Sequence, residues 1–217
     1  MTRSFAVFLF AFLVPLSACS AESDVNIPAA DIQQGKDYVV LQRPVPTSDP
    51  SKIEVVEVFW YGCIHCFNLE PLIQEWKAGL ADDVNFVGMP AIWAPVMELH
   101  AKMFYANQAL NLEEELHQAI FDEMNTGKKN QLPSERAILS FVESQGVDAK
   151  SYQRALNSFG VGSQVEKARS LMGAYQIRST PQMVVNGKYV LTTQEGHERM
   201  LQVVSALIEK ERAALSD

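Results

Sequence analysis

The sequence predicts an α/β fold in which a long helical segment interrupts a domain built around a β-sheet. Three observations support this prediction. An apolar, β-branched run at residues 53–60 is followed by a stretch with helical spacing. Residues 93–175 are almost wholly helical in pattern, and Asn186-Gly187 separates two β-rich runs before a last helical stretch. The predicted order is strand, helix, strand, helical block, strand hairpin and helix.

The first 18 residues predict a secretory signal segment. A basic start at Arg3 precedes an apolar run at residues 5–16, and small residues follow it. This run is too short to span a bilayer as a lasting helix. We therefore expect export from the cytoplasm, so that the mature cysteines face an oxidising compartment.

The end of the signal segment admits two interpretations. Residues 16–19 read Leu-Ser-Ala-Cys, which resembles a bacterial lipobox and implies that Cys19 becomes the lipidated first residue of the mature chain. A third cysteine that otherwise lacks a partner favours this interpretation. The alternative is simple cleavage near Ser20 or Ala21, because small residues also stand at the required spacing there.

Beyond the signal, the prediction divides the chain into a tether, a sheet-containing domain and a helical insertion. Residues 19–51 contain four prolines and a short edge strand at residues 38–41. A second strand at residues 84–88 ends before Pro90. The divisions are residues 19–51 for the tether and edge strand, 52–92 and 176–217 for the sheet-containing domain, and 93–175 for the insertion.

The insertion is predicted to hold four to five helices. Ser134 and Asp148 stand where two of them would begin. Asn111 with Glu114, and Ser163 with Glu166, have the spacing of capping boxes, which would mark two further helix starts. Asn186-Gly187 predicts a two-residue hairpin turn, since both positions need positive φ. This order of elements is that of a thioredoxin-like fold with a helical insertion.

The composition and charge of the chain limit the classes of molecule that it can bind. The chain has 217 residues, of which 47% are apolar, so it can form a substantial core. Its formal charge is −8, and removal of the one charge in the signal segment, Arg3, makes it −9. An acidic surface argues against nucleic acid or anionic lipid as a binding partner.

Cys63 and Cys66 are the only cysteines left after the signal segment and the lipobox are set aside. They lie at a predicted strand-to-helix turn, which places Cys63 in the first turn of the helix. Unpaired N–H groups and the helix dipole favour an anion there, so we expect Cys63 to be rich in thiolate. A static disulfide and a zinc site remain as alternatives. The chain disfavours zinc, because it has no second Cys-x-x-Cys and no nearby histidine pair.

Residues 57–70 resemble the active-site segment of the bacterial DsbA family of thiol:disulfide oxidoreductases. The matching features are Cys-x-His-Cys at 63–66, a Glu six residues before the first cysteine, a Glu seven residues after it, and Thr180-Pro181 before the closing hairpin. They extend over most of the mature chain. The resemblance implies a thioredoxin-like fold, and no cofactor beyond a redox-active Cys63–Cys66 disulfide.

The resemblance implies a role for each residue of this segment. Cys63 would be the nucleophile, Cys66 the buried resolving partner, and His65 a group that stabilises the Cys63 thiolate. Glu57 would be an acid–base group near Cys66, although an edge position with its side chain in water is the alternative. Glu70 is expected to be a solvated helix residue that modulates charge near the site.

Two departures from the family pattern bear on the mechanism. The family often has a Lys before the second strand as the partner of Glu57, whereas residues 81–83 here read Ala-Asp-Asp, and Lys77 is a conceivable substitute. Many members have Val before the conserved proline, whereas Thr180 is the residue found in disulfide isomerases and some lipid-anchored relatives.

The resemblance also implies a docking surface for substrate chains. Pro181 is expected to follow a cis peptide bond, which leaves the Thr180 backbone free to pair with an extended segment, and Trp60 and Tyr61 are expected to line the same groove. The other histidines, His100, His117 and His197, are predicted to be ordinary surface or core residues.

The leading functional prediction is a periplasmic enzyme that donates its disulfide to newly exported, cysteine-containing proteins. It would be a monomer, anchored to a membrane if Cys19 is lipidated, and reoxidised by a quinone-linked membrane partner of the DsbB type. A disulfide isomerase or reductase is the alternative within the same chemistry, although residues 20–51 look too short to form a dimerisation domain. A non-catalytic, lipid-anchored chaperone or adaptor is the alternative from another class.

Overall fold

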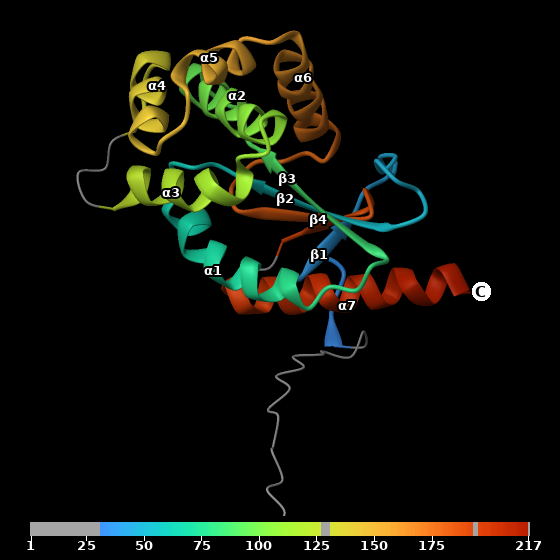
Figure 1. Ribbon diagram of the computed structural model, residues 1–217. Helices are drawn as coiled ribbons and strands as arrows, with labels where there is room; N and C mark the ends of the chain where they lie inside the picture. Colours follow the sequence, from blue (N-terminus) through green and yellow to red (C-terminus); the bar gives the residue numbers. More distant parts are fainter. Residues whose placement is uncertain (1–30, 127–130, 193–194, 217) are drawn as a thin grey trace, which may run out of the picture.

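The computed structural model describes residues 31–126, 131–192 and 195–216, whose strands form one five-stranded sheet (Figure 1). The strand order is β1-β5-β4-β2-β3, and only β2 and β3 run parallel to each other among the neighbouring pairs. The strands are β1 (Tyr38–Val40), β2 (Ile53–Phe59), β3 (Val84–Pro90), β4 (Gln182–Val185) and β5 (Tyr189–Leu191).

Helices cover both faces of this sheet. α1 (Ile64–Ala78) and α7 (His197–Ser216) lie below it in Figure 1, and the helices between β3 and β4 lie on its other side. These are α2 (Pro95–Ala109), α3 (Glu113–Asn125), α4 (Glu135–Ser144), α5 (Ala149–Leu156) and α6 (Phe159–Ala174). The arrangement confirms the predicted α/β, thioredoxin-like fold with an inserted helical region.

β2 is the centre of the structure, because it is buried along its whole length. Ile53 and Val55 pack with α1 and α7, whereas Val56 and Val58 pack in the core that the helical insertion forms. A strand covered on both faces has no polar side, which explains the nearly continuous apolar run in the sequence.

The closing hairpin has the predicted turn. Asn186 and Gly187 have φ of 51° and 58°, and β4 pairs with β5 on either side of them. Gly187 is required for a second reason, since a Cβ there would lie 2.0 Å from the carbonyl oxygen of Val45. The Val45 N–H donates to the Gly187 carbonyl at 2.8 Å, so the segment before β2 packs directly on the turn.

Two local predictions are wrong. β3 continues through Pro90, which a strand at the sheet edge tolerates because that proline needs no ladder donor. Neither capping box forms. α3 begins only at Glu113, and Asn111 before it has φ of 56°, while α6 begins at Phe159, where the Ser158 side chain accepts from the Val161 N–H. Ser158 takes the cap five residues before Ser163.

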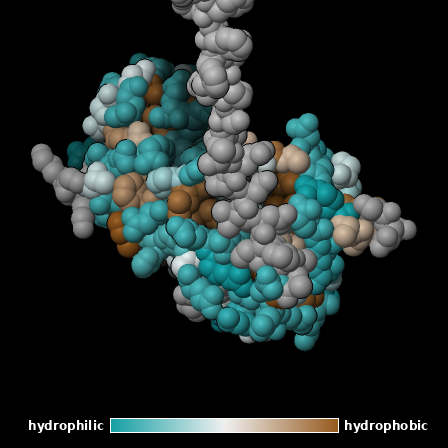
Figure 2. All heavy atoms as spheres, turned by 90° about the horizontal axis from the view of Figure 1, so that it is seen from below, coloured by the Kyte–Doolittle hydropathy of each residue, from teal (hydrophilic) through white to brown (hydrophobic). Residues whose placement is uncertain are grey.

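The predicted signal segment and Cys19 lie outside the described residues. Across the ranges that are described, no helix is long and apolar enough to cross a membrane. Hydrophilic residues predominate on the face shown in Figure 2, in keeping with a chain of which 20% is charged.

Candidate active site

The site begins where β2 ends. The chain turns through residues 60–62 and enters α1 with Cys63 as the N-cap, in extended backbone conformation (φ −90°, ψ 111°). The Cys63 sulfur accepts from the Cys66 N–H at 3.4 Å, as a capping side chain does. Gly62 permits the turn, because a Cβ there would lie 2.5 Å from the Trp60 ring.

Cys63 and Cys66 are both free thiols in this structure, and they differ in environment. Cys63 is partly exposed, and its pKa is lowered from 9.0 to about 5. The hydrogen bond from the Cys66 thiol is the main cause of this lowering, and burial acts in the opposite direction. Hydrogen bonds from Thr180 and from the backbone N–H groups of Cys66 and His65 lower the pKa further. Cys66 is fully buried, and burial foremost raises its pKa far above the ordinary range. The proton therefore stays on Cys66 while Cys63 ionises.

The segment before β4 brings Thr180 and Pro181 to Cys63. The Thr180–Pro181 peptide bond is cis, the isomer that the family resemblance implies. The Thr180 carbonyl oxygen lies 3.5 Å from the Cys63 sulfur, although the two residues are 117 positions apart in the chain. The fold thus brings together two motifs that lie far apart in the sequence.

Trp60 and Tyr61 are each fixed by a histidine from the helical insertion. The Trp60 indole N–H donates to His100 Nδ1 at 2.9 Å, and His100 Nε2 lies 3.2 Å from the Leu132 carbonyl oxygen. The Tyr61 hydroxyl lies 2.9 Å from His117 Nδ1. Trp60 is partly exposed, whereas the Tyr61 side chain is buried, so Tyr61 supports the turn and has no ring surface for a docking chain.

His100 and His117 are the residues whose part in the site the sequence did not reveal. His100 is a buried residue of α2, and burial lowers its pKa, so the ring stays neutral and can accept from Trp60. His117 on α3 also reaches α1, where its Nε2 lies 3.4 Å from Glu70 Oε2. Neither histidine belongs to a motif, so their role becomes visible only when the helical insertion is seen beside the active-site turn.

Glu57 is buried, with 3% of its surface exposed, which rules out the alternative that its side chain lies in water at an edge. It lies in the middle of β2 and lines a cleft between α1, β3 and α3. Burial, followed by the charge of Glu70, raises its pKa well above the usual range, and Lys77 acts in the opposite direction. No donor in the described part of the chain reaches Glu57 Oε1.

Glu70 lines the same cleft and corrects a second expectation. It is not a solvated helix residue, because only 2% of it is exposed. Burial alone would raise its pKa, but the contact with His117 and the hydrogen bond from Gln74 lower it overall. His117 Nε2 lies 3.4 Å from Oε2 without the geometry of a hydrogen bond, so no donor among the described residues hydrogen-bonds to Oε2.

His65 is exposed, and its backbone N–H is one of the groups that lower the Cys63 pKa. Its ring faces the ring of His197 at the start of α7, with 6.5 Å between the ring centroids. Within the described ranges, no group of three or more His, Cys, Asp or Glu side chains is placed to hold a metal ion.

Comparison with known proteins agrees with this site. Residues 69–207 match the family model described as a DSBA-like thioredoxin domain. The chain is 44% identical to the thiol:disulfide interchange protein DsbA of Azotobacter vinelandii over 192 residues, which cover 87% of this chain and 89% of that protein. At most 13% of the chain lies outside that alignment, so it includes both the Cys63–Cys66 and the Thr180–Pro181 motifs wherever it begins.

Two further relatives come from Pseudomonas aeruginosa and Neisseria meningitidis. The P. aeruginosa DsbA sequence is 43% identical over 188 residues, and a crystal structure of that protein superposes with a TM-score of 0.84 at 40% identity, covering 88% of this chain and all of that one. The oxidoreductase NmDsbA3 of N. meningitidis superposes with a TM-score of 0.76 at 29% identity, covering 86% of this chain and all of that one.

Proposed function

Because the chain belongs to the DsbA family of thiol:disulfide interchange proteins, we propose that it donates a Cys63–Cys66 disulfide to cysteine pairs of newly exported proteins. The observation that carries this proposal is the Cys63 environment, in which the sulfur caps α1 and its pKa is lowered to about 5. A thiolate stabilised to this degree is a good leaving group, and it makes the disulfide form a strong oxidant.

The exchange takes two steps. A substrate thiolate attacks the Cys63 sulfur of the disulfide, a mixed disulfide forms, and the Cys66 sulfur leaves with the electron pair. The second substrate thiolate then attacks the first substrate sulfur, and Cys63 leaves as a thiolate. The substrate gains a disulfide, and the enzyme pair is reduced by the same two electrons.

The first step needs a proton at Cys66, because a buried thiolate there is strongly disfavoured. Glu57 is the proposed donor, since burial raises the pKa of its carboxyl well above the usual range, and ionisation of Glu57 in turn raises the pKa of Cys66. The cleft that Glu57 lines also contains Lys77, Glu70 and His117, which connect the buried carboxyl to the surface. Lys77 opposes the rise in the Glu57 pKa, which supports it as the substitute for the missing family lysine.

The substrate would dock across Cys63 as an extended segment. The Thr180 carbonyl oxygen lies 3.5 Å from the Cys63 sulfur, in the segment just before β4. A substrate strand can therefore pair with the Thr180 backbone while the substrate cysteine faces Cys63. Trp60, which is partly exposed and held by His100, would form the neighbouring wall. His65 is proposed to add a stabilising charge at the mouth of the site.

The remaining assignments follow from the family and the signal segment. We place the protein in the periplasm, as a monomer that needs no cofactor beyond the Cys63–Cys66 pair and does not bind nucleic acid. A quinone-linked membrane partner of the DsbB type would reoxidise it, and a lipid on Cys19 would hold it at a membrane. A mass measurement that finds an unmodified mature chain beginning after residue 19 would refute the lipid.

The test replaces the nucleophile. Cys63→Ser should abolish oxidation of a reduced two-cysteine peptide while the fold stays intact, because the serine hydroxyl can also cap α1. Cys19→Ser is the matched control, since it changes a cysteine outside the site, and we expect the parent rate. A Cys63→Ser protein that oxidises the peptide at the parent rate would rule out the mechanism and favour an adaptor with a structural cysteine pair.

A further inference from the structure

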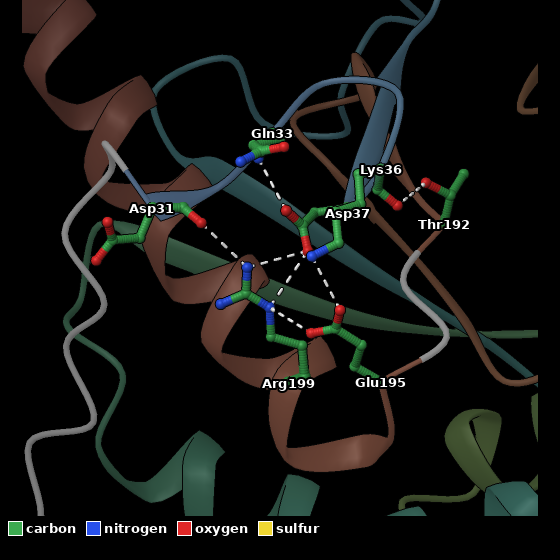
Figure 3. Close-up of polar contacts among 7 residues, drawn as sticks. All are labelled: Asp31, Gln33, Lys36, Asp37, Thr192, Glu195 and Arg199. Atoms are coloured by element: carbon green, nitrogen blue, oxygen red, sulfur yellow. Dashed lines mark hydrogen bonds and ion pairs between the residues drawn. The ribbon is translucent and has the colours of Figure 1, made fainter.

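The start of α7 is clamped to the segment that precedes β1 (Figure 3). Arg199 in the first turn of α7 donates to Asp37 Oδ1 at 3.0 Å and 3.2 Å, and to the Asp31 carbonyl oxygen at 3.1 Å. Asp37 is almost fully buried, and it also accepts from the Gln33 N–H at 2.8 Å. The pair therefore fixes this end of α7 far more firmly than an exposed ion pair would.

A second set of contacts holds the residues just before α7. Lys36 Nζ lies 2.9 Å from Glu195 Oε1, and the Thr192 hydroxyl donates to the Lys36 carbonyl at 3.0 Å. Glu195 also reaches Arg199, with 3.8 Å between Oε2 and Nε. The segment 31–37 thus contacts both the first turn of α7 and the residues just before it, and His197 is the first residue of α7.

The clamp brings His197 to the active site. Its ring meets that of His65 edge to face, with 6.5 Å between the ring centroids and 79° between the planes, and His197 is partly buried. His65 is exposed on its other sides, so His197 is a neighbouring ring that limits where the His65 imidazole can lie. The sequence did not place His197 in the site, because it is 132 residues away in the chain.

We propose that His197 is a positioning residue of the active site, which holds the His65 imidazole at the mouth of the site and is coupled to it by charge. This inference rests on the proposed role of Cys63 as the nucleophile. Two imidazolium rings at this separation repel each other, so a charged His65 disfavours protonation of His197. His197 thus limits where the His65 ring can lie, while the repulsion favours a single positive charge in the pair.

The other charges near His197 fit this account. Burial lowers the pKa of His197 most, the His65 ring lowers it further, and the Cys63 thiolate raises it. From the clamp, Asp37 is neutralised by Arg199 and Lys36 by Glu195. Glu198, next along α7, is exposed to solvent. Among the described residues, His65 and Cys63 are thus the charged groups that act on His197.

The experiment is a pH titration of the His197 ring by NMR in the reduced, full-length mature protein. His65→Gln removes the neighbouring imidazole and should raise the pKa of His197 by about half a unit to one unit, from the repulsion expected at this separation in a partly hydrated site. His65→Lys keeps a positive charge there and should leave the pKa of His197 near the parent value. Lys167→Gln, an exposed change on α6, is the control and should leave it unchanged.

Only the substitution that removes the charge at position 65 should move the His197 pKa. A His197 titration that is the same in the parent and His65→Gln overturns the proposal, and so does a shift of equal size in His65→Lys or Lys167→Gln. The NMR titration does not measure disulfide transfer, so this proposal and the proposed function can fail independently. A parent protein that transfers no disulfide but has coupled histidines would refute the function alone.

Discussion

Cys66→Ala is the substitution that most directly tests why Cys63 ionises. The hydrogen bond from the Cys66 thiol is the largest cause of the lowered Cys63 pKa, and alanine removes that donor but leaves the backbone N–H in place. The change also leaves the nucleophile itself intact. We therefore expect Cys63 in this variant to remain reactive but to hold its proton to higher pH.

The size of the effect follows from the exposure of the sulfur. A hydrogen bond to a charged group contributes about 1.5–3 kcal/mol when buried, and the partial exposure of Cys63 reduces this to about 1–1.5 kcal/mol. That corresponds to about one pKa unit. The pKa of Cys63 should therefore rise from about 5 in the parent to about 6 in Cys66→Ala.

The sign of the stability change follows from the same shift. A thiol whose pKa is depressed on folding stabilises the reduced native state fully above the ordinary value of 9.0, and this contribution is lost as the pH falls through about 5. At pH 7 Cys66→Ala should therefore weaken the ionisation-linked stabilisation of the reduced protein by about 1 kcal/mol.

The assay is the thiolate absorbance near 240 nm followed against pH in the reduced proteins. The parent should show one transition near pH 5, and Cys63→Ala should show none below pH 8, because Cys66 keeps its proton. A parent whose thiol titrates near its ordinary value, or a Cys66→Ala variant with an unchanged transition, would refute the account of how the site stabilises the thiolate.

Three further predictions concern the surroundings of the pair. Glu57→Gln should be more stable than the parent by about 1–3 kcal/mol at pH 8 and equally stable at pH 4. The reason is that a protein with a buried acid of raised pKa loses stability as the pH rises from about 4.5. Denaturant unfolding at both pH values checks this, and a parent with no such pH dependence contradicts it. Thr180→Val should raise the pKa of Cys63 and weaken the protein as an oxidant with little change in the unfolding free energy of the oxidised protein, and a redox titration equal to that of the parent would count against it. His100→Phe leaves the Trp60 N–H without its acceptor, so it should destabilise the fold by about 1–3 kcal/mol and alter the Trp60 environment in near-UV circular dichroism; parent-like values would show that the contact matters little.

The parts of the site that the sequence revealed are those carried by local patterns. Cys63 and Cys66 lie at a strand-to-helix turn because the residues before them favour a strand and those after them a helix, and Asn186-Gly187 marks its hairpin because both positions need positive φ. Such signals depend on a few adjacent residues, so they can be recognised without knowledge of the tertiary contacts.

The parts that the sequence could not reveal depend on packing between distant elements. Glu70 looked like a solvated helix residue, and only the approach of α3 with His117 shows that it is buried and paired. His100 likewise has no motif, because its partner Trp60 lies 40 residues away. The capping box at Ser163 failed because Ser158, five residues earlier, caps α6, and the box at Asn111 failed because α3 begins after Leu112 with no side-chain cap.

The central claim is that electrons flow from the substrate to the Cys63–Cys66 pair, and the redox equilibrium of this pair with glutathione measures it. The Cys63–Cys66 pair should be titrated against reduced and oxidised glutathione at pH 7. The stabilised Cys63 thiolate predicts that glutathione keeps the pair largely reduced, so that the protein is the stronger oxidant. A pair that stays oxidised under the same glutathione ratio, as a structural disulfide does, would contradict the proposed donation of a disulfide.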